Sequence, residues 1–221
     1  MFVSLFFFGF VCLFCLFSSL SFAQGRFVSG FEEAEFCALE KVLCNSFSWI
    51  AMPERVATDC MANNSGGGEE MRLTFDSEGA LLGAISKRRI SNASVPLLAS
   101  RAMRVSLSVE TPVALPPGCA VGMKRAQLDS AVTISLARRK ARRTFLHRST
   151  RGVFQIDMTR VETEGHSGTS FEVELELVQW AIQPHVSEHD RRVWSAALVE
   201  FVYQAAQGQI SELKFPSFES L

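Results

Sequence analysis

Residues 171–177 read Phe-Glu-Val-Glu-Leu-Glu-Leu, an unbroken alternation of apolar and acidic side chains. Successive side chains of a β-strand point to opposite faces. The apolar residues of such a strand line one face, and three acids line the other: Glu172, Glu174 and Glu176. Neighbouring carboxylates repel one another unless water, a basic side chain or a metal ion lies over them.

A block of the opposite charge lies upstream. Residues 138–151 contain seven Lys or Arg residues and no acid, although the formal net charge of the whole chain is only −1. Carboxylates bind hard divalent cations, and Lys and Arg bind phosphate oxygens. An acidic strand together with a basic strand therefore indicates a site for a metal ion and a polyphosphate.

The chain has 221 residues, and its first 23 residues, Met1 to Ala23, are apolar and uncharged. This leader resembles a secretory signal peptide without the usual basic residues, and it is long enough to span a bilayer if it stays uncleaved. An unused upstream extension is a third interpretation. We expect residues 24–221 to form one domain with its own core, because no internal repeat or further boundary is visible.

Four cysteines follow the leader, at spacings that match no zinc motif: Cys37, Cys44, Cys60 and Cys119. They permit two disulfides in an oxidising compartment, and equally free thiols. Asn63 and Asn92 lie in glycosylation sequons.

Helices are predicted on either side of a strand-rich middle. Capping and apolar spacing indicate a helix from Ser29 to about Cys44, with Phe36, Leu39 and Leu43 on one face. A second helix is predicted over 187–207, with an apolar face and Gly208 at its end.

Between the helices, period-two patterns predict short strands separated by Gly and Pro turns. The clearest of them cover residues 71–75, 103–109, 153–159 and 171–177. A sandwich with a solvated outer face is the ordinary explanation of such alternation. A closed barrel with a polar lumen is the alternative. The nearly pure sign of the basic and the acidic strand favours the barrel, as do the two amphipathic helices that need apolar surface to cover.

Three ordered motifs carry a family resemblance. They are Lys140-Ala141-Arg142-Arg143-Thr144-Phe145, then Ile156-Asp157-Met158-Thr159, then Glu172-Val173-Glu174-Leu175-Glu176. This order and spacing resembles the fungal and protozoal RNA 5′-triphosphatases of mRNA capping, which are triphosphate tunnel metalloenzymes. Arg104-Val105-Ser106 resembles an earlier Arg-x-Ser strand of the family. The resemblance covers residues 69–179 and implies an α+β fold with an eight-stranded antiparallel β tunnel, a polar lumen and flanking helices.

The resemblance also implies roles for individual residues. Lys140 and Arg142 would grip the triphosphate, with Arg104 as a further contact. Asp157 and Thr159 would orient these basic groups. Metal ligands, for Mg²⁺ or Mn²⁺, would be Glu70, Glu174 and Glu176, with Glu172 in support.

One departure concerns the family's first tunnel strand, which carries Glu-x-Glu before a hydrophobic residue and Arg. Glu70-Met71-Arg72 fits the second Glu, but Gly68 occupies the place of the first. Glu69 points to the other face of a regular strand, and only a bulge would bring it back.

Parity along the basic strand separates Lys140 and Arg142 from Arg139 and Arg143, which we expect on the outside, solvated or paired. The sequence shows no nucleophile with a His or Asp relay, and no phosphate-binding Gly loop followed by Lys.

The resemblance implies hydrolysis of the γ-phosphate at the 5′-triphosphate end of nascent RNA, in the nucleus, with a capping guanylyltransferase as a possible partner and no role for DNA. A tripolyphosphatase or nucleoside triphosphatase of the same fold is one rival. The other is a secreted or membrane-anchored polyanion-binding domain with weak or no catalysis, which the leader favours. The membrane would be a partner only if the leader stays uncleaved.

Overall fold

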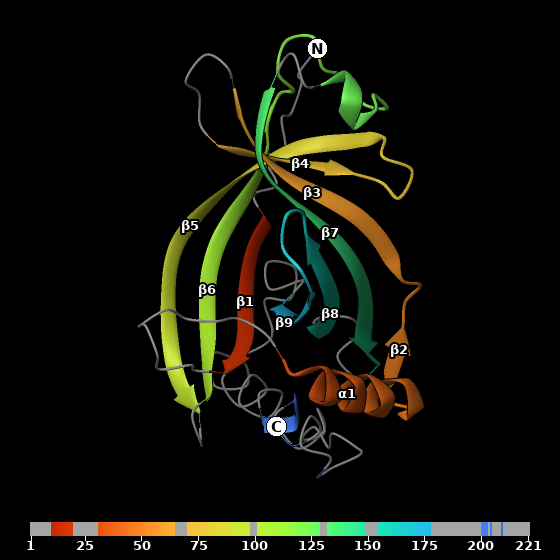
Figure 1. The fold of residues 1–221 in the computed structure, drawn as a ribbon. Helices are drawn as coiled ribbons and strands as arrows, with labels where there is room; N and C mark the ends of the chain where they lie inside the picture. The colour runs from red at the N-terminus through yellow and green to blue at the C-terminus, as the bar shows by residue number, and fades with distance from the viewer. Residues whose placement is uncertain are drawn as a thin grey trace, which may run out of the picture.

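A computed structural model describes residues 10–19, 31–64, 70–97, 101–128, 132–148, 154–177, 200–202, 204 and 209, with the backbone alone at 10–19, 64, 91–97, 101–107, 154 and 176–177. Nine strands of the described residues join in one antiparallel sheet (Figure 1). Their bounds are β1 Phe10–Ser19, β2 Trp49–Ala51, β3 Arg55–Asn64, β4 Met71–Phe75, β5 Leu81–Leu97, β6 Arg101–Pro112, β7 Val132–His147, β8 Phe154–Thr163 and β9 Thr169–Leu177.

The sheet curls until it meets itself. Its order is β2-β7-β3-β4-β5-β6-β1-β9-β8, and β8 also pairs with β7. Eight strands therefore form a ring, and β2 is an extra strand on the flank of β7. The closed ring confirms the predicted antiparallel tunnel. Within it, the basic strand β7 and the acidic strand β9 lie on either side of β8.

The strand β1 comes from the leader. All ten of its residues pair with β6, from Phe10 opposite Glu110 to Ser19 opposite Arg101. On its other side Cys15 and Leu16 pair with Leu175 and Glu174 of β9. The composition of residues 1–23 predicts a leader apart from the domain, whereas ten of these residues form a strand of the ring. Unbroken apolar composition suits a strand as well as a membrane helix, and only pairing partners distinguish the two.

A helix covers part of the outer face of the sheet, next to β9 and β2. Helix α1 (Glu33–Asn45) buries the predicted face of Phe36, Leu39 and Leu43, and each such side chain contributes roughly 1.5–3 kcal/mol. Phe36 packs on Phe171 of β9 with ring centroids 5.1 Å apart. Helix α1 begins four residues later than predicted, because the backbone N–H of Phe31 donates to Phe171 in a bridge that keeps the chain extended.

A second core lies under the loop between β6 and β7, which contains the 3₁₀ turn η1 (Arg125–Gln127). Leu73, Phe75 and Leu81 from β4 and β5 are fully buried there together with Leu128. The apolar side chains of β4 therefore point outward, which leaves Arg72 and Thr74 on the inner face.

Other predictions have mixed outcomes. The strands at 71–75, 103–109, 153–159 and 171–177 are present as β4, β6, β8 and β9. Most of the helix predicted at 187–207 lies outside the described residues, although 200–202 are helical and Phe201 stacks on Trp49. The four cysteines that follow the leader are free thiols. In the part of the chain with defined placement, no helix has the length and apolarity to cross a bilayer.

Candidate active site in the tunnel lumen

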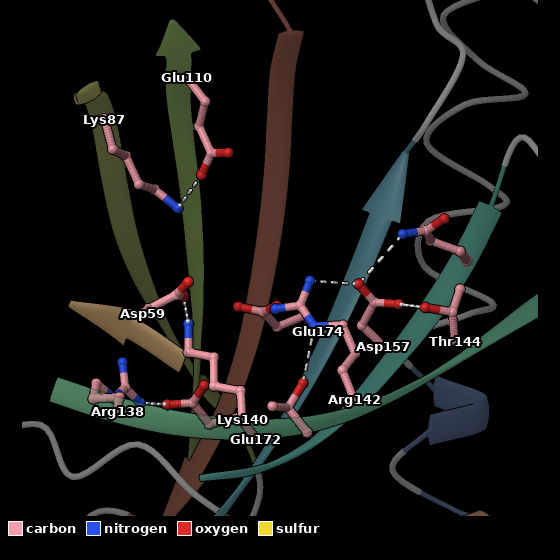
Figure 2. Close-up of polar contacts among 12 residues, drawn as sticks. Asp59, Lys87, Glu110, Arg138, Lys140, Arg142, Thr144, Asp157, Glu172 and Glu174 are labelled. Atoms are coloured by element: carbon pink, nitrogen blue, oxygen red, sulfur yellow. Dashed lines mark hydrogen bonds and ion pairs between the residues drawn. The ribbon is translucent and has the colours of Figure 1, made fainter. Parts of the chain in front are cut away.

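Arg142 stands at the centre of the polar network inside the tunnel (Figure 2). Its Nη1 lies 3.0 Å from Asp157 Oδ2 on β8, and its Nη2 lies 3.1 Å from Glu174 Oε2 on β9. Its Nε donates to Thr159 Oγ1 at 3.2 Å. Both acids are buried, so they hold a guanidinium whose own side chain is 32% exposed. The predicted orienting role of Asp157 and Thr159 has a matching geometry.

Asp157 accepts further hydrogen bonds on its two oxygens. Thr144 Oγ1 donates to Oδ1 at 2.5 Å, and Gln155 Nε2 donates to Oδ2 at 3.3 Å. Neighbours on β7 and β8 thus fix a carboxylate that in turn fixes Arg142. A side chain with its rotamer locked from several directions presents its partner in one orientation.

Lys140, two residues before Arg142 on the same face, is held by a residue that the sequence analysis missed. Its Nζ lies 2.7 Å from Asp59 Oδ2 on β3, and Thr74 Oγ1 donates to Asp59 Oδ1 at 2.9 Å. Burial raises the pKa of the Asp59 carboxyl, but Lys140 and Arg72 outweigh it and bring the pKa below its ordinary value. The acid therefore stays ionised near neutral pH.

A third group of charges lines β4, β5 and β6. Glu110 accepts from Arg72 at 3.0 Å and pairs with Lys87 at 3.2 Å. Burial raises the pKa of Glu110, and the two cations outweigh that effect and lower it. Arg72 Nε also lies 3.9 Å from Asp59, which joins this group to Lys140. Sequence alternation in β4 and β6 could have placed Arg72 and Glu110 inside, but it could not show that they meet.

The acidic strand β9 divides between two basic partners. Glu172 pairs with Arg138 at 2.5 Å, and Glu174 pairs with Arg142. Burial raises the pKa of Glu174, as do the charges of Glu172 and Asp157, while Arg142 opposes them. Both acids contact cations in this structure, where the resemblance implies that Glu174 binds a metal ion and that Glu172 supports it.

Three predicted residues lie apart from these contacts or carry no described side chain. Arg104 is in β6, opposite Leu16 of β1, and Glu176 is in β9, opposite Gln155 of β8; only their backbones are described. Glu70 is exposed immediately before β4. Its neighbour Met71 pairs with Ala62, whereas Arg142 pairs with Arg55 at the other end of β3. At about 3.3 Å per residue, this separates Glu70 from Arg142 by roughly 25 Å along the strand.

The outward residues of β7 follow the predicted parity. Arg139 Nη1 lies 3.0 Å from Glu162, and Arg143 Nη1 lies 3.2 Å from Glu40 of α1. The inner face of this strand therefore lines a lumen of cations and acids, and the outer face carries ordinary ion pairs.

A closed antiparallel ring with Lys, Arg, Asp and Glu facing inward defines a tunnel protein that binds a highly charged anion. The family model of the mRNA capping enzyme beta chain matches residues 23–204, and the chain belongs to this family. Its class is that of the RNA 5′-triphosphatases. The match begins after β1.

Solved structures agree on the fold. The S. pombe Pct1 RNA triphosphatase is 17% identical, with a TM-score of 0.60, over 90% of this chain and 80% of that one. The same protein in complex with the Spt5 CTD gives a TM-score of 0.57 at the same identity and coverage. A search of curated proteins finds no match.

Proposed function

We propose that this chain removes the γ-phosphate from the 5′-triphosphate end of nascent RNA, the first step of mRNA capping. The observation that carries the proposal is the pair of Lys140 and Arg142 side by side in the tunnel, each held by a buried or half-buried acid. Family membership supplies the reaction class.

Hydrolysis of a phosphoric anhydride spreads negative charge over the phosphoryl oxygens in the transition state. Preorganised cations stabilise that charge without having to move at the moment of reaction. Arg142 has donors fixed by Asp157 and Thr159 on one side, and its exposed part faces the lumen. Lys140 on the same strand and Arg72 on β4 supply further charge. These three residues would grip the triphosphate while water attacks the γ-phosphorus.

Two buried polar atoms add to this picture. Arg72 Nε and Ser108 Oγ have no hydrogen-bond partner in the part of the chain that the structure describes. Ser108 precedes Glu110 by two residues on β6 and shares its face. Buried donors without a partner cost free energy unless a ligand satisfies them. We propose that phosphate oxygens accept from both.

A resident Mg²⁺ or Mn²⁺ on Glu174, Glu176 and Glu70 is the ligand set implied by the resemblance. Within the described residues, no three His, Cys, Asp or Glu side chains gather as a metal-binding group. Glu174 is committed to Arg142, and Glu70 is distant. The described residues do not fit a resident ion, and the role of Glu176 stays a prediction. The steps above therefore rest on the cations of the chain.

Partners and location follow from the activity. Recognition through the triphosphate, not through bases, implies little preference for RNA sequence and no role for DNA. We propose a capping guanylyltransferase as the enzyme that consumes the product, because capping adds a guanylate to the diphosphate end. One solved relative is in complex with the Spt5 CTD, and a similar contact here is a proposal. A capping role implies the nucleus, whereas secretion or membrane anchoring through residues 1–23 is the alternative.

Phosphate release from triphosphate-ended RNA, ATP and inorganic tripolyphosphate tests the function. The full chain is assayed with Mg²⁺, with Mn²⁺ and in EDTA, beside Arg142→Ala and the outer-face control Arg139→Ala. We expect the RNA to be the preferred substrate, and only Arg142→Ala to lose activity. Faster phosphate release from tripolyphosphate or ATP than from RNA would mean that RNA is not the substrate. Binding of all three without phosphate release would indicate a polyanion-binding domain.

A further inference from the structure

Exposed apolar side chains gather where the tunnel ends at β2. Among the described residues, seven large apolar side chains are exposed, and three of these lie within residues 47–52. They are Phe47, Ile50 and Met52, which we call the apolar mouth. Phe47, in the turn before β2, is 90% exposed. The strand β2, the end of β7 and helix α1 lie together at one end of the molecule (Figure 1). A cluster of exposed apolar side chains, unlike single ones, indicates a contact with a ligand or partner.

The apolar mouth continues the inner wall of the tunnel. Ile50 is paired with Leu146 of β7, and the backbone N–H of Met52 donates to Thr144 O at 2.8 Å. Because side chains alternate along β7, Thr144 and Leu146 lie on the same face as Arg142, and Ile50 and Met52 share this inner face. Leu146 follows Arg142 by four residues, which is about 13 Å along the strand. An extended triphosphate whose γ-phosphate lies at Arg142 reaches its ribose and base over such a distance.

Two exposed arginines flank the apolar mouth. Arg55 lies opposite Arg142 on the inner face. The backbone N–H of Arg148 donates to Ser48 O at 2.8 Å, which extends the pairing of β2 with β7 by one residue and places Arg148 on the inner side as well. In the described part of the chain neither arginine has an ion-pair partner, whereas every basic residue at 138–143 has one. Cations without acids beside an apolar surface are typical of sites for single-stranded nucleic acid, in which bases stack and phosphates meet positive charge.

The opposite end of the tunnel differs in charge. The strand β7 has no charged residue from Val132 to Ala137, and Glu70 is exposed at that end, immediately before β4. An exposed acid repels the phosphates of an RNA strand. At the β2 end, Glu54 is paired with Arg160 on the outer face, and the register position of Glu176 is on β9, three strands from β2. The RNA chain therefore finds the more favourable exit beside β2.

We propose that this end of the tunnel holds the first nucleotide of the RNA. Its base packs on the apolar mouth, Arg55 contacts the triphosphate, and Arg148 contacts the phosphates of the following nucleotides. Stacking on an aromatic side chain accepts every base. The surface therefore favours a triphosphate that carries a nucleotide over a free polyphosphate, without selecting an RNA sequence. This inference rests on the RNA triphosphatase function proposed above, and it names the part of the substrate that lies outside the triphosphate.

Equilibrium binding of three unhydrolysed ligands to the full chain tests the proposal. All three contain a methylene-bridged triphosphate, and they differ in its ester group, which is methyl, one nucleoside or a six-nucleotide RNA. We expect the nucleoside ligand to bind at least about tenfold more tightly than the methyl ester, and the RNA to bind more tightly still at low salt. Equal binding of the three ligands overturns the proposal.

Substitutions at the surface assign the parts of the ligand. Phe47→Ala and Met52→Ser should each weaken binding of the nucleoside and the RNA about fivefold and leave the methyl ester unchanged. Arg148→Ala should weaken only the RNA, and should reduce the slope of log affinity against log salt concentration by roughly 0.7. The control is Val121→Ala, which alters a side chain that is 67% exposed in the loop between β6 and β7 and should change none of the affinities.

Other outcomes contradict the proposal or separate it from the function. Equal weakening of all three ligands by Phe47→Ala or Met52→Ser would show a general structural effect and contradict it. Association of the protein that Phe47→Ala abolishes, with RNA binding unchanged, would assign the surface to a second copy of the chain instead. Because none of the ligands is hydrolysed, the expected order of affinities without any phosphate release would remove the proposed function and leave this binding surface in place.

Discussion

The inner and outer faces of β7 carry the same residue types with different consequences. On the inner face, Lys140 and Arg142 meet acids from β3, β8 and β9 that are at most 14% exposed. On the outer face, Arg139 pairs with Glu162 where both side chains are more than half exposed. Exposed pairs contribute little because water and salt screen them. The same residue types therefore form the candidate site on one face and ordinary ion pairs on the other.

The inner and outer faces of β7 differ only while the ring is closed. Removal of β1 therefore has the largest expected effect. A protein that starts at Gln24 leaves β6 and β9 without the strand that joins them. We expect a loss of roughly 4 kcal/mol in the free energy of unfolding and a melting temperature lower by on the order of 10 °C. Thermal unfolding of both proteins measures it. An unchanged melting temperature would mean that the leader is dispensable, as its signal-like composition suggests.

Substitutions on the two faces test the comparison directly. Lys140→Ala or Arg142→Ala removes charge from the transition state and should slow phosphate release on the order of a hundredfold, or about 3 kcal/mol. Arg139→Ala and Arg143→Ala should stay within about twofold, because both side chains lie on the outer face and cannot contact a phosphate in the lumen. Equal losses from all four would indicate a diffuse basic patch in place of an ordered lumen.

His147, the last residue of β7, lies on the outer face and makes the stability of the protein depend on pH. Its ring lies 4.8 Å from that of Trp49, and burial lowers its pKa from 6.5 to about 4. Between these values the unfolded chain binds more protons, so stability is full above pH 6.5 and falls as pH decreases toward 4. Urea unfolding at pH 7 and pH 5 should show a loss of about 2 kcal/mol from this residue. In His147→Gln that part of the difference should disappear, and its persistence would assign it to other groups.

The smallest effect separates positioning from direct contact on the inner face. Thr144 reaches the site only through Asp157, which its hydroxyl contacts at 2.5 Å. Thr144→Val should lower kcat about tenfold with little change in KM, since a loosened Asp157 misaligns Arg142 without removing charge; this corresponds to about 1.4 kcal/mol. Thr144→Ser keeps the hydroxyl and should restore the rate. A serine variant as slow as the valine variant would point to packing instead.

The sequence by itself determined which face each residue occupies. Alternation at 71–75 and 171–177 places Arg72, Thr74, Glu172 and Glu174 on polar faces, and parity along 138–143 separates inward from outward cations. The apolar face of α1 was equally readable. These are local properties, because the period of a strand or a helix is fixed by backbone geometry alone.

The tertiary structure alone decided which of these residues meet. Asp59 carries no motif, yet it contacts Lys140 from 81 positions away because β3 pairs with β7. Glu110 meets Arg72 across 38 positions for the same kind of reason. Register between distant strands depends on the summed packing of the whole ring, which no short stretch encodes. The position of residues 10–19 in the ring was also not predictable, because an apolar run fits a strand as well as a membrane helix until its pairing partners are known.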